Sequence, residues 1–220
     1  MTTAIIEKLS VNDRLSRIDE ISKSCESYAL TRSFHRTIAV AKAMRELKAL
    51  MTGEVLQHCL DLQSSQLGFL TDKDRDGGYP ADVVRDVVIE ATLRGLSVCG
   101  NEFNIISGRL YATKNGLARL VKELPGFADL KLVEGKPENA GNGAGAYVPM
   151  KATWTLNGQA DHLDAIIPVK VNAGMGADAI LGKANRKMLA RIYSRVTGSN
   201  QSYEDDSDAG SESVEAKEAG

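Results

Sequence analysis

Tyr147–Val171 reads YVPMKATWTLNGQADHLDAIIPVKV and restricts the fold class more than any other part of the chain. Both of its halves are rich in β-branched and aromatic residues, which predicts strands over Tyr147–Leu156 and Asp164–Val171. Asn157-Gly158 lies between them, and this dipeptide is typical of the tight turn of a β-hairpin. The sequence therefore predicts one long antiparallel hairpin.

The segments before this hairpin also contain short runs of strand-forming residues. Glu102–Ser107 and Arg109–Ala112, separated by a glycine, predict a small hairpin, and Leu130–Val133 predicts a further strand. Thr113 is a suitable N-cap for a helix between the small hairpin and that strand. Glu138–Gly145 (ENAGNGAG) has little capacity for packing, and we expect it to be a flexible loop.

Helices are expected on both sides of these strands. Apolar residues at helical spacing predict them, together with Thr52 as an N-cap and Gly95 as a C-cap glycine. The expected helices are Asp13–Ser24, Ser33–Met51, Gly53–Gln66, Ala81–Arg94 and Ala177–Val196.

Because strands and helices do not alternate strictly, the order predicts an α+β protein rather than a doubly wound parallel sheet. An antiparallel sheet, made of the short hairpin and the long hairpin, is expected to pack on helices. We divide the chain into a helical N-terminal region (1–80), an α+β core (81–198) and an acidic tail (199–220) whose composition predicts disorder. The N-terminal helices are expected either to cover the core or to make subunit contacts.

The formal net charge of −2 conceals an uneven distribution of charge. Residues 203–220 hold seven acidic residues and one lysine, so the rest of the chain has 26 basic against 22 acidic residues. Residues 109–198 alone hold 13 basic and 7 acidic residues. A basic body with an acidic tail is common among proteins that bind nucleic acid, although acidic tails also occur elsewhere.

The last predicted helix carries two stripes. Every fourth residue from Ile180 to Val196 is apolar, which predicts its buried side. Cations recur with the same spacing on a neighbouring face, and such neighbours repel each other. They are Lys183, Lys187, Arg191 and Arg195, with Arg186 beside them. A phosphate backbone would relieve the repulsion; the alternative is a solvated face that pairs with the acidic tail or with another subunit.

A second cluster surrounds the predicted N-terminus of the helix after Thr113. It consists of Arg109, Tyr111, Lys114, Asn115 and Arg119. Backbone N–H groups at a helix start bind anions, and a tyrosine can stack on a base. The alternative is that Tyr111 is an ordinary strand residue.

The motifs of several enzyme classes are missing from the sequence. There is no GxxxxGK[ST], GxSxG or HExxH, and neither the three histidines nor the three cysteines have metal-site spacing. Within the predicted loop Asp72–Pro80, Asp72–Gly77 matches the first half of a calcium loop, but Val83 stands where the bidentate glutamate is required, so we expect a helix-capping turn. Trp154 is expected in the core. The sequence thus predicts a protein without a catalytic site.

Three segments follow one another in an order that resembles a known family. They are ATLRGL (91–96), NEFNIISGRLY (101–111) and KNGLAR (114–119), with PGF (125–127) after them. This order resembles the core of the RecT and Redβ annealing proteins of phages, and Ala177–Gly198 is similar to the closing helix of that family. The resemblance covers Ala81–Gly198. The family often has an aromatic residue just before its closing helix, where this chain has Gly174-Met175-Gly176.

The resemblance implies ATP-independent annealing of complementary single strands on an oligomeric ring or helical filament. The strands would lie in a basic groove formed by the hairpins and closing helices of successive subunits, with phosphates on the cations and bases near Tyr111 or Asn115. The candidate DNA-binding residues are Arg109, Tyr111, Lys114, Asn115, Arg119, Lys151, Lys170, Lys183, Arg186, Lys187, Arg191 and Arg195.

The expected partners are single-stranded DNA, the annealed duplex, other copies of the chain, and a replication or exonuclease protein of host or phage. No cofactor is expected; a divalent cation would at most modulate binding. The sequence has no run of about 18 apolar residues and no signal peptide, so we expect a protein of the bacterial cytoplasm without a membrane partner.

Two other hypotheses remain. One is a non-enzymatic phage interaction or regulatory module whose basic helix binds another protein chain. The other, which is the weakest, is a small enzyme with a site assembled from scattered residues. Binding of single-stranded DNA at physiological salt separates the first hypothesis from annealing.

Overall fold

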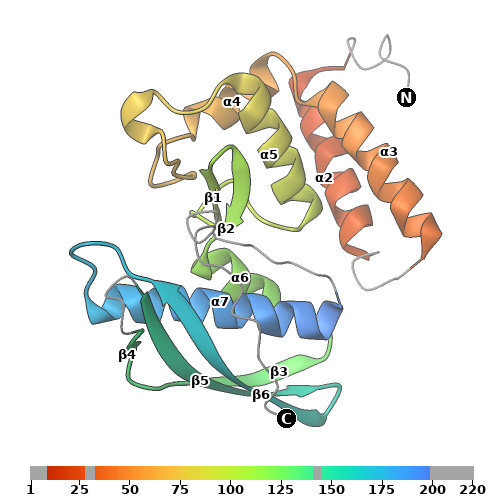
Figure 1. Ribbon diagram of the computed structural model, residues 1–220. Coiled ribbons are helices and arrows are strands. Elements are labelled where there is room, and N and C mark those ends of the chain that lie inside the picture. The colour runs from red at the N-terminus through yellow and green to blue at the C-terminus, as the bar shows by residue number, and fades with distance from the viewer. Residues whose placement is uncertain (1–8, 28–32, 141–144, 199–220) are drawn as a thin grey trace, which may run out of the picture.

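The computed structural model describes residues 9–27, 33–140 and 145–198 and has the predicted α+β architecture, with antiparallel strands throughout its sheets. Four helices form one end of the molecule, and a sheet covered by the last helix forms the other (Figure 1). The expected acidic tail, residues 199–220, lies outside the described residues. None of the helices described is long and apolar enough to cross a membrane.

The N-terminal end consists of α2 (Val11–Ser27), α3 (Phe34–Leu50), α4 (Glu54–Asp61) and α5 (Ala81–Leu93). Three of these helices match the prediction closely, whereas α4 ends five residues early and is capped by Gly53 instead of Thr52. The chain turns back after α4, because the Ser64 N–H donates to the Phe69 carbonyl (2.9 Å) and the Phe69 N–H to the Leu62 carbonyl (3.3 Å).

None of the aspartates in the Asp72–Pro80 loop caps the helix that follows it. The N-cap of α5 is Pro80, which makes no side-chain cap, so this prediction was wrong. Instead, the Asp72 carboxylate accepts hydrogen bonds from the Tyr79 hydroxyl (2.8 Å) and the Ser107 N–H (3.0 Å), and the Gly108 N–H donates to the Tyr79 hydroxyl (2.8 Å). The loop therefore anchors the tip of the next hairpin. No group of three His, Cys, Asp or Glu side chains in the described residues could hold a metal ion.

The small hairpin joins β1 (Phe103–Ile106) to β2 (Arg109–Ala112), as predicted, and forms a two-stranded sheet of its own, separate from the sheet that contains the long hairpin. Its turn residues Ser107 and Gly108 have φ of 52° and 73°, the left-handed values that a two-residue type I′ turn requires. Thr113 then caps α6 (Lys114–Lys122), since its hydroxyl accepts a hydrogen bond from the Gly116 N–H at 3.3 Å. This confirms the predicted cap.

The larger sheet is built around β5 (Gly145–Leu156). Its whole length pairs with β6 (Gln159–Lys170), and its other edge pairs with β3 (Phe127–Glu134) and β4 (Glu138–Asn139). The Asn157-Gly158 turn is confirmed, but β6 begins five residues before Asp164, because a two-residue turn allows pairing to start at Leu156 with Gln159. The loop prediction is wrong for Glu138 and Asn139; residues 141–144 lie outside the described residues.

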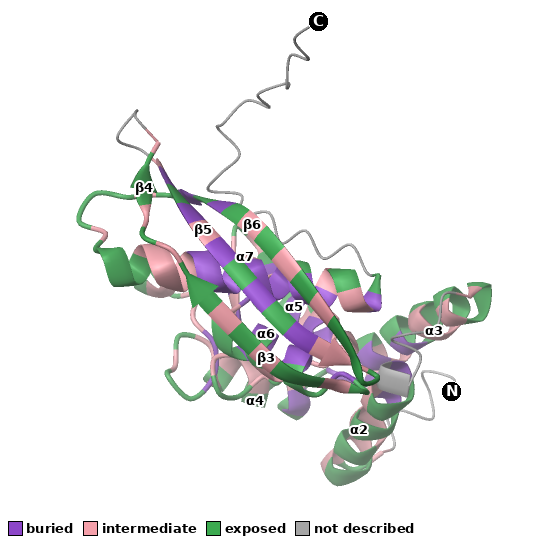
Figure 2. Cartoon of the chain, turned by 90° about the horizontal axis from the view of Figure 1, so that it is seen from below, coloured by how far each residue is buried: buried purple, intermediate pink, exposed green. Residues whose placement is uncertain are grey.

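The sheet buries one face and leaves the other open (Figure 2). Val148, Met150, Ala152 and Trp154 alternate along β5 and are at most 2% exposed, which confirms Trp154 as a core residue. The helix α7 (Ala177–Thr197) packs against this face of the sheet and also against α6. It buries Met188, Leu189 and Ile192, each stabilising the fold by roughly 1.5–3 kcal/mol, so α7 joins the sheet to the rest of the molecule.

Two helical glycines provide a matched test of this packing. At Gly116 of α6, a Cβ atom would come within 2.3 Å of the Glu102 carbonyl oxygen, whereas at Gly182 of α7 it would meet nothing within 4 Å. Gly116→Ala should destabilise the protein by about 1–3 kcal/mol through overpacking. Gly182→Ala should stabilise it by about 0.5–1 kcal/mol, because alanine favours helix. Urea denaturation measures both; equal effects would contradict the packing of α6 on the Glu102 segment.

Candidate nucleic-acid interface

The basic face of α7 runs along strand β6. The Lys183 ammonium donates to the Lys170 carbonyl (3.3 Å), and the Lys187 ammonium donates to the Pro168 carbonyl (2.9 Å). Further along, the Arg195 guanidinium pairs with Asp161 (2.9 Å) and holds the pKa of that carboxyl below its usual value. Residue numbers rise along α7 as they fall along β6, so the helix and the strand are antiparallel. Backbone carbonyls orient the two lysines without neutralising their charge.

Arg191 lies between Lys187 and Arg195 on this face. It is exposed and forms no hydrogen bond or ion pair with the described part of the chain. We call Lys183, Lys187, Arg191 and Arg195 the α7 cation row. Residues four apart on a helix are neighbours, so the row presents a line of positive charge along the surface.

Arg186 does not share the face of the cation row. Its side chain is buried, at 4% exposure, and its guanidinium carbon lies 4.1 Å from the centre of the Tyr111 ring. Nε, Nη1 and Nη2 are buried without a hydrogen-bond partner. The sequence interpretation that placed Arg186 beside the row missed this burial. A buried cation is unfavourable unless acceptors surround it, and the contact with the ring offsets the loss only partly.

The small hairpin and the start of α6 supply the other predicted residues. Arg109, Lys114 and Asn115 are exposed, and Tyr111 is half-buried with Arg186 over its ring. Lys114 and Asn115 make no side-chain hydrogen bond within the described residues, and they form the first turn of α6. The contact between Arg186 and Tyr111 therefore brings the hairpin and α7 together at one place.

Arg119 belongs to a different part of the molecule. Its guanidinium donates to both Glu102 carboxylate oxygens (2.5 and 2.6 Å), to Glu123 (2.5 Å) and to the Gly95 carbonyl (2.5 Å), and the carboxylates raise its pKa. It also lines a cavity of about 440 Å³ together with Leu15 of α2 and Val55 of α4. Its geometry indicates a structural role, and it does not join the cluster that the sequence predicted around the helix start.

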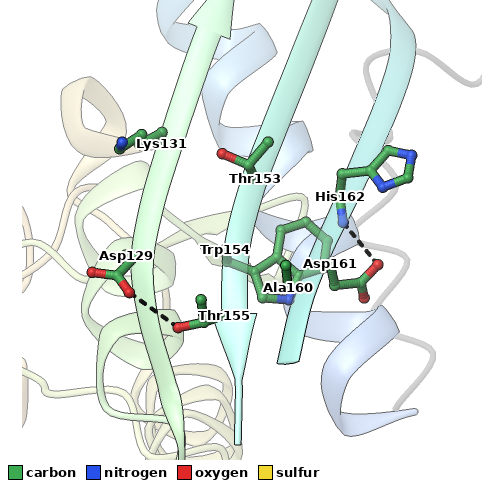
Figure 3. Close-up of a pocket in the computed structure, with 8 residues that line it drawn as sticks. All are labelled: Asp129, Lys131, Thr153, Trp154, Thr155, Ala160, Asp161 and His162. Carbon is green, nitrogen blue, oxygen red and sulfur yellow. Dashed lines mark hydrogen bonds between the residues drawn. The ribbon is translucent and has the colours of Figure 1, made fainter. Parts of the chain in front are cut away.

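Lys151 and Lys170 lie on the outer face of the sheet, away from the face that packs on α7. The Lys151 ammonium is 3.5 Å from the Asp164 carboxylate, its cross-strand neighbour. The same outer face has a shallow hollow of about 450 Å³ near the Asn157-Gly158 turn (Figure 3). Its polar side chains include Lys131, His162 and Asp129, whose carboxylate accepts a hydrogen bond from Thr155. The twelve predicted residues therefore do not form one surface.

The sequence interpretation did not single out Lys131 or His162. Strand alternation and the register could have placed them, because Lys131 and His162 are both cross-strand partners of Thr153. The register itself depends on an irregularity between Ala128 and Lys131, where Asp129 has a φ of 55°. No sequence pattern indicated that irregularity.

Comparison of the chain with known protein families, with curated proteins and with solved structures finds no match.

Two cations of α6 test the division between structural and interface residues. Arg119→Met should destabilise the protein by about 2 kcal/mol, because it removes the guanidinium that donates to the largely buried Glu102 carboxylate and to the Gly95 carbonyl, and leaves the carboxylate only the Ser97 N–H. Lys114→Met should change stability by no more than about 0.5 kcal/mol. Chemical denaturation measures both, and oligonucleotide binding should fall only for Lys114→Met. An Arg119→Met variant that is as stable as the parent but binds the oligonucleotide more weakly would show that Arg119 belongs to the interface and is not structural.

Proposed function

We propose that this protein binds single-stranded DNA and anneals complementary strands without ATP, as an oligomer in the bacterial cytoplasm. The observation that carries the proposal is the concentration of positive charge on α7, where Lys183, Lys187, Arg191 and Arg195 follow one another at four-residue spacing. Lys183 and Lys187 donate to neutral carbonyls, and Arg191 and Arg186 have no carboxylate partner in the described residues. Phosphates supply the missing negative charge, and releasing their counterions favours binding.

The residue types in this region fit sequence-tolerant binding. Cations hold the phosphate backbone, whereas bases are distinguished by groups that reach their edges. Annealing requires the bases to remain free for pairing, so contacts to the backbone should dominate. Asn115 in the first turn of α6 and the Tyr111 ring on the neighbouring hairpin are the candidates for base contact. The resemblance to the RecT and Redβ family supports the same function.

The main rival is a protein-binding module that uses the same basic helix. It predicts no binding of single-stranded DNA at physiological salt, so one measurement separates the two proposals.

Lys187→Ala with Arg191→Ala tests the α7 cation row. Because each phosphate contact with a single strand contributes about 0.7 to the salt slope of log K, the double variant should reduce that slope by about 1.4 and weaken binding at least about tenfold. The control is Arg75→Ala with Lys122→Ala, which removes the same charge from exposed positions without partners in the described residues. Anisotropy titrations at several salt concentrations give the slopes; equal slopes for the two double variants would exclude the row as the binding surface.

Exposed apolar side chains favour self-association. They gather mainly on two surfaces: Phe34 and Ile38 on α3, and Val133, Tyr147 and Ile166 on the outer face of the sheet. Phe34, Val133 and Ile166 are 78%, 62% and 65% exposed, and such patches typically mark contact sites. The two surfaces belong to opposite ends of the molecule (Figure 1), and contact between unlike surfaces generates rings or filaments.

Contact between two copies of α3 is less favourable than contact between α3 and the sheet. Lys42 and Arg45 are exposed on α3 without partners in the described residues, so two α3 surfaces would bring like charges together. The sheet face carries both signs of charge, for example Lys151 and Asp164. We therefore propose a head-to-tail contact in which α3 of one copy packs on the sheet of the next.

Mixing two variants tests this arrangement. Phe34→Glu should block one surface and Ile166→Glu the other, so each variant alone should remain monomeric at concentrations where the parent assembles. A mixture of equal amounts should form a heterodimer and nothing larger, because each variant retains one intact surface. Light scattering coupled to gel filtration measures the masses. A parent that stays monomeric with DNA present, or a mixture that stays monomeric, would contradict the head-to-tail contact.

A further inference from the structure

Arg186 is the one side chain in the described residues that has an entire charged group buried without acceptors. Its three guanidinium nitrogens are all buried and lack hydrogen-bond partners, and the residue is 4% exposed. A guanidinium has five N–H donors and stays protonated, so it cannot relieve this situation by losing its charge. The contact with the Tyr111 ring is worth about 2 kcal/mol or more when it is desolvated, which offsets only part of the several kcal/mol that burial of an ion costs.

The burial of Arg186 is unfavourable for the stability of the folded protein. Replacing buried charged groups by apolar residues of similar size is often neutral or stabilising. The presence of a side chain that reduces stability therefore requires a reason other than stability. Ligand binding is a common reason, because binding sites are often less stable than the rest of the protein when no ligand is bound. No described carboxylate makes a hydrogen bond or ion pair with the Arg186 guanidinium, which lies against the Tyr111 ring, so an anion entering there would be its first charged partner.

We propose that Arg186 is a phosphate-binding residue of the interface and that the Tyr111 ring is a displaceable cover over it. This inference rests on the proposed function for the identity of the anion, a phosphodiester of single-stranded DNA. When the ring turns away, a phosphate enters between α7 and the hairpin and accepts paired hydrogen bonds from the guanidinium. The released ring is then available to stack on a neighbouring base.

The backbone of the hairpin that carries the Tyr111 ring is held at both ends of β2. Tyr111 lies near the end of β2, whereas Asp72 and Tyr79 anchor the opposite end of the hairpin through Ser107 and Gly108. Directly after β2, the Thr113 N–H donates to the Glu102 carbonyl (2.9 Å) and fixes the connection to α6. Because both ends of β2 are held, the proposed movement would be a change of the Tyr111 rotamer and not an opening of the hairpin.

The test measures both stability and binding. Replacing a structural residue lowers the unfolding temperature, whereas replacing a buried charge that serves binding raises it. Without ligand, Arg186→Met should unfold at a temperature about 2–8 °C higher than the parent, since an unpaired buried charge is removed. Its affinity for an oligothymidylate and for an abasic strand of equal length should fall about tenfold. Tyr111→Ala should keep the abasic affinity within about threefold and should lose the preference for the strand that has bases. Lys122→Met, which removes an exposed cation from α6, should change neither property.

Each outcome decides the proposal. An Arg186→Met protein that unfolds at a lower temperature, or fails to fold, shows that the guanidinium is structural and overturns it, as does unchanged affinity for both strands. Failure of the proposed function is seen separately, when the parent binds neither strand. In that case tripolyphosphate serves as the probe. If it raises the unfolding temperature of the parent but not that of Arg186→Met, an anion site at Arg186 is supported. If it changes neither unfolding temperature, the anion site is excluded.

Discussion

Helix α7 packs against the inner face of the sheet and against α6 at the same time, and the rest of the structure depends on this double contact. Its apolar side chains Met188, Leu189 and Ile192 are almost completely buried. Two buried sides leave only a narrow part of the helix at the surface, and that part carries the cation row. The row therefore lies along the edge of β6 as a consequence of packing, with Lys183 and Lys187 oriented by strand carbonyls.

The same double contact explains why Arg186 is unusual. Arg186 is buried on α7 against the Tyr111 ring, yet it is a cation where an apolar residue would pack without loss. Arg119 shows the contrast, because two glutamates and a carbonyl accept hydrogen bonds from its donors. Arg119, which is structural, thus has hydrogen-bond acceptors within the protein, whereas the buried nitrogens of Arg186 have none among the described residues. For this reason we connect Arg186 with an external anion.

Local signals in the sequence predicted most of the fold. The Asn157-Gly158 turn, the Thr113 cap and the alternation around Trp154 each act over a few residues, and each was confirmed. The errors arose where contacts between residues far apart in the sequence determine the structure of a segment. The early end of α4 depends on a turn back to Phe69, and Asp72 binds a hairpin 35 residues away. β4 exists only because β5 offers an unpaired edge beyond β3.

The candidate site was predictable in part for the same reason. A period of four residues identified the cation row and one buried stripe, but it could not reveal that α7 has a second buried side, so Arg186 was placed with the exposed cations. The role of Arg119 depends on Glu102, 17 residues earlier, and the separation of Lys151 from the row depends on which face of the sheet α7 covers. These are properties of the tertiary structure.

The annealing rate of two complementary dye-labelled oligonucleotides tests the central claim most directly. The full chain is added without any nucleotide triphosphate, and energy transfer between the dyes reports duplex formation over time. We expect the rate to rise at least about tenfold over the rate without protein and to decline as salt increases, because phosphate contacts hold the strands. An unchanged rate at protein concentrations well above those of the strands, at both low and physiological salt, would contradict the account.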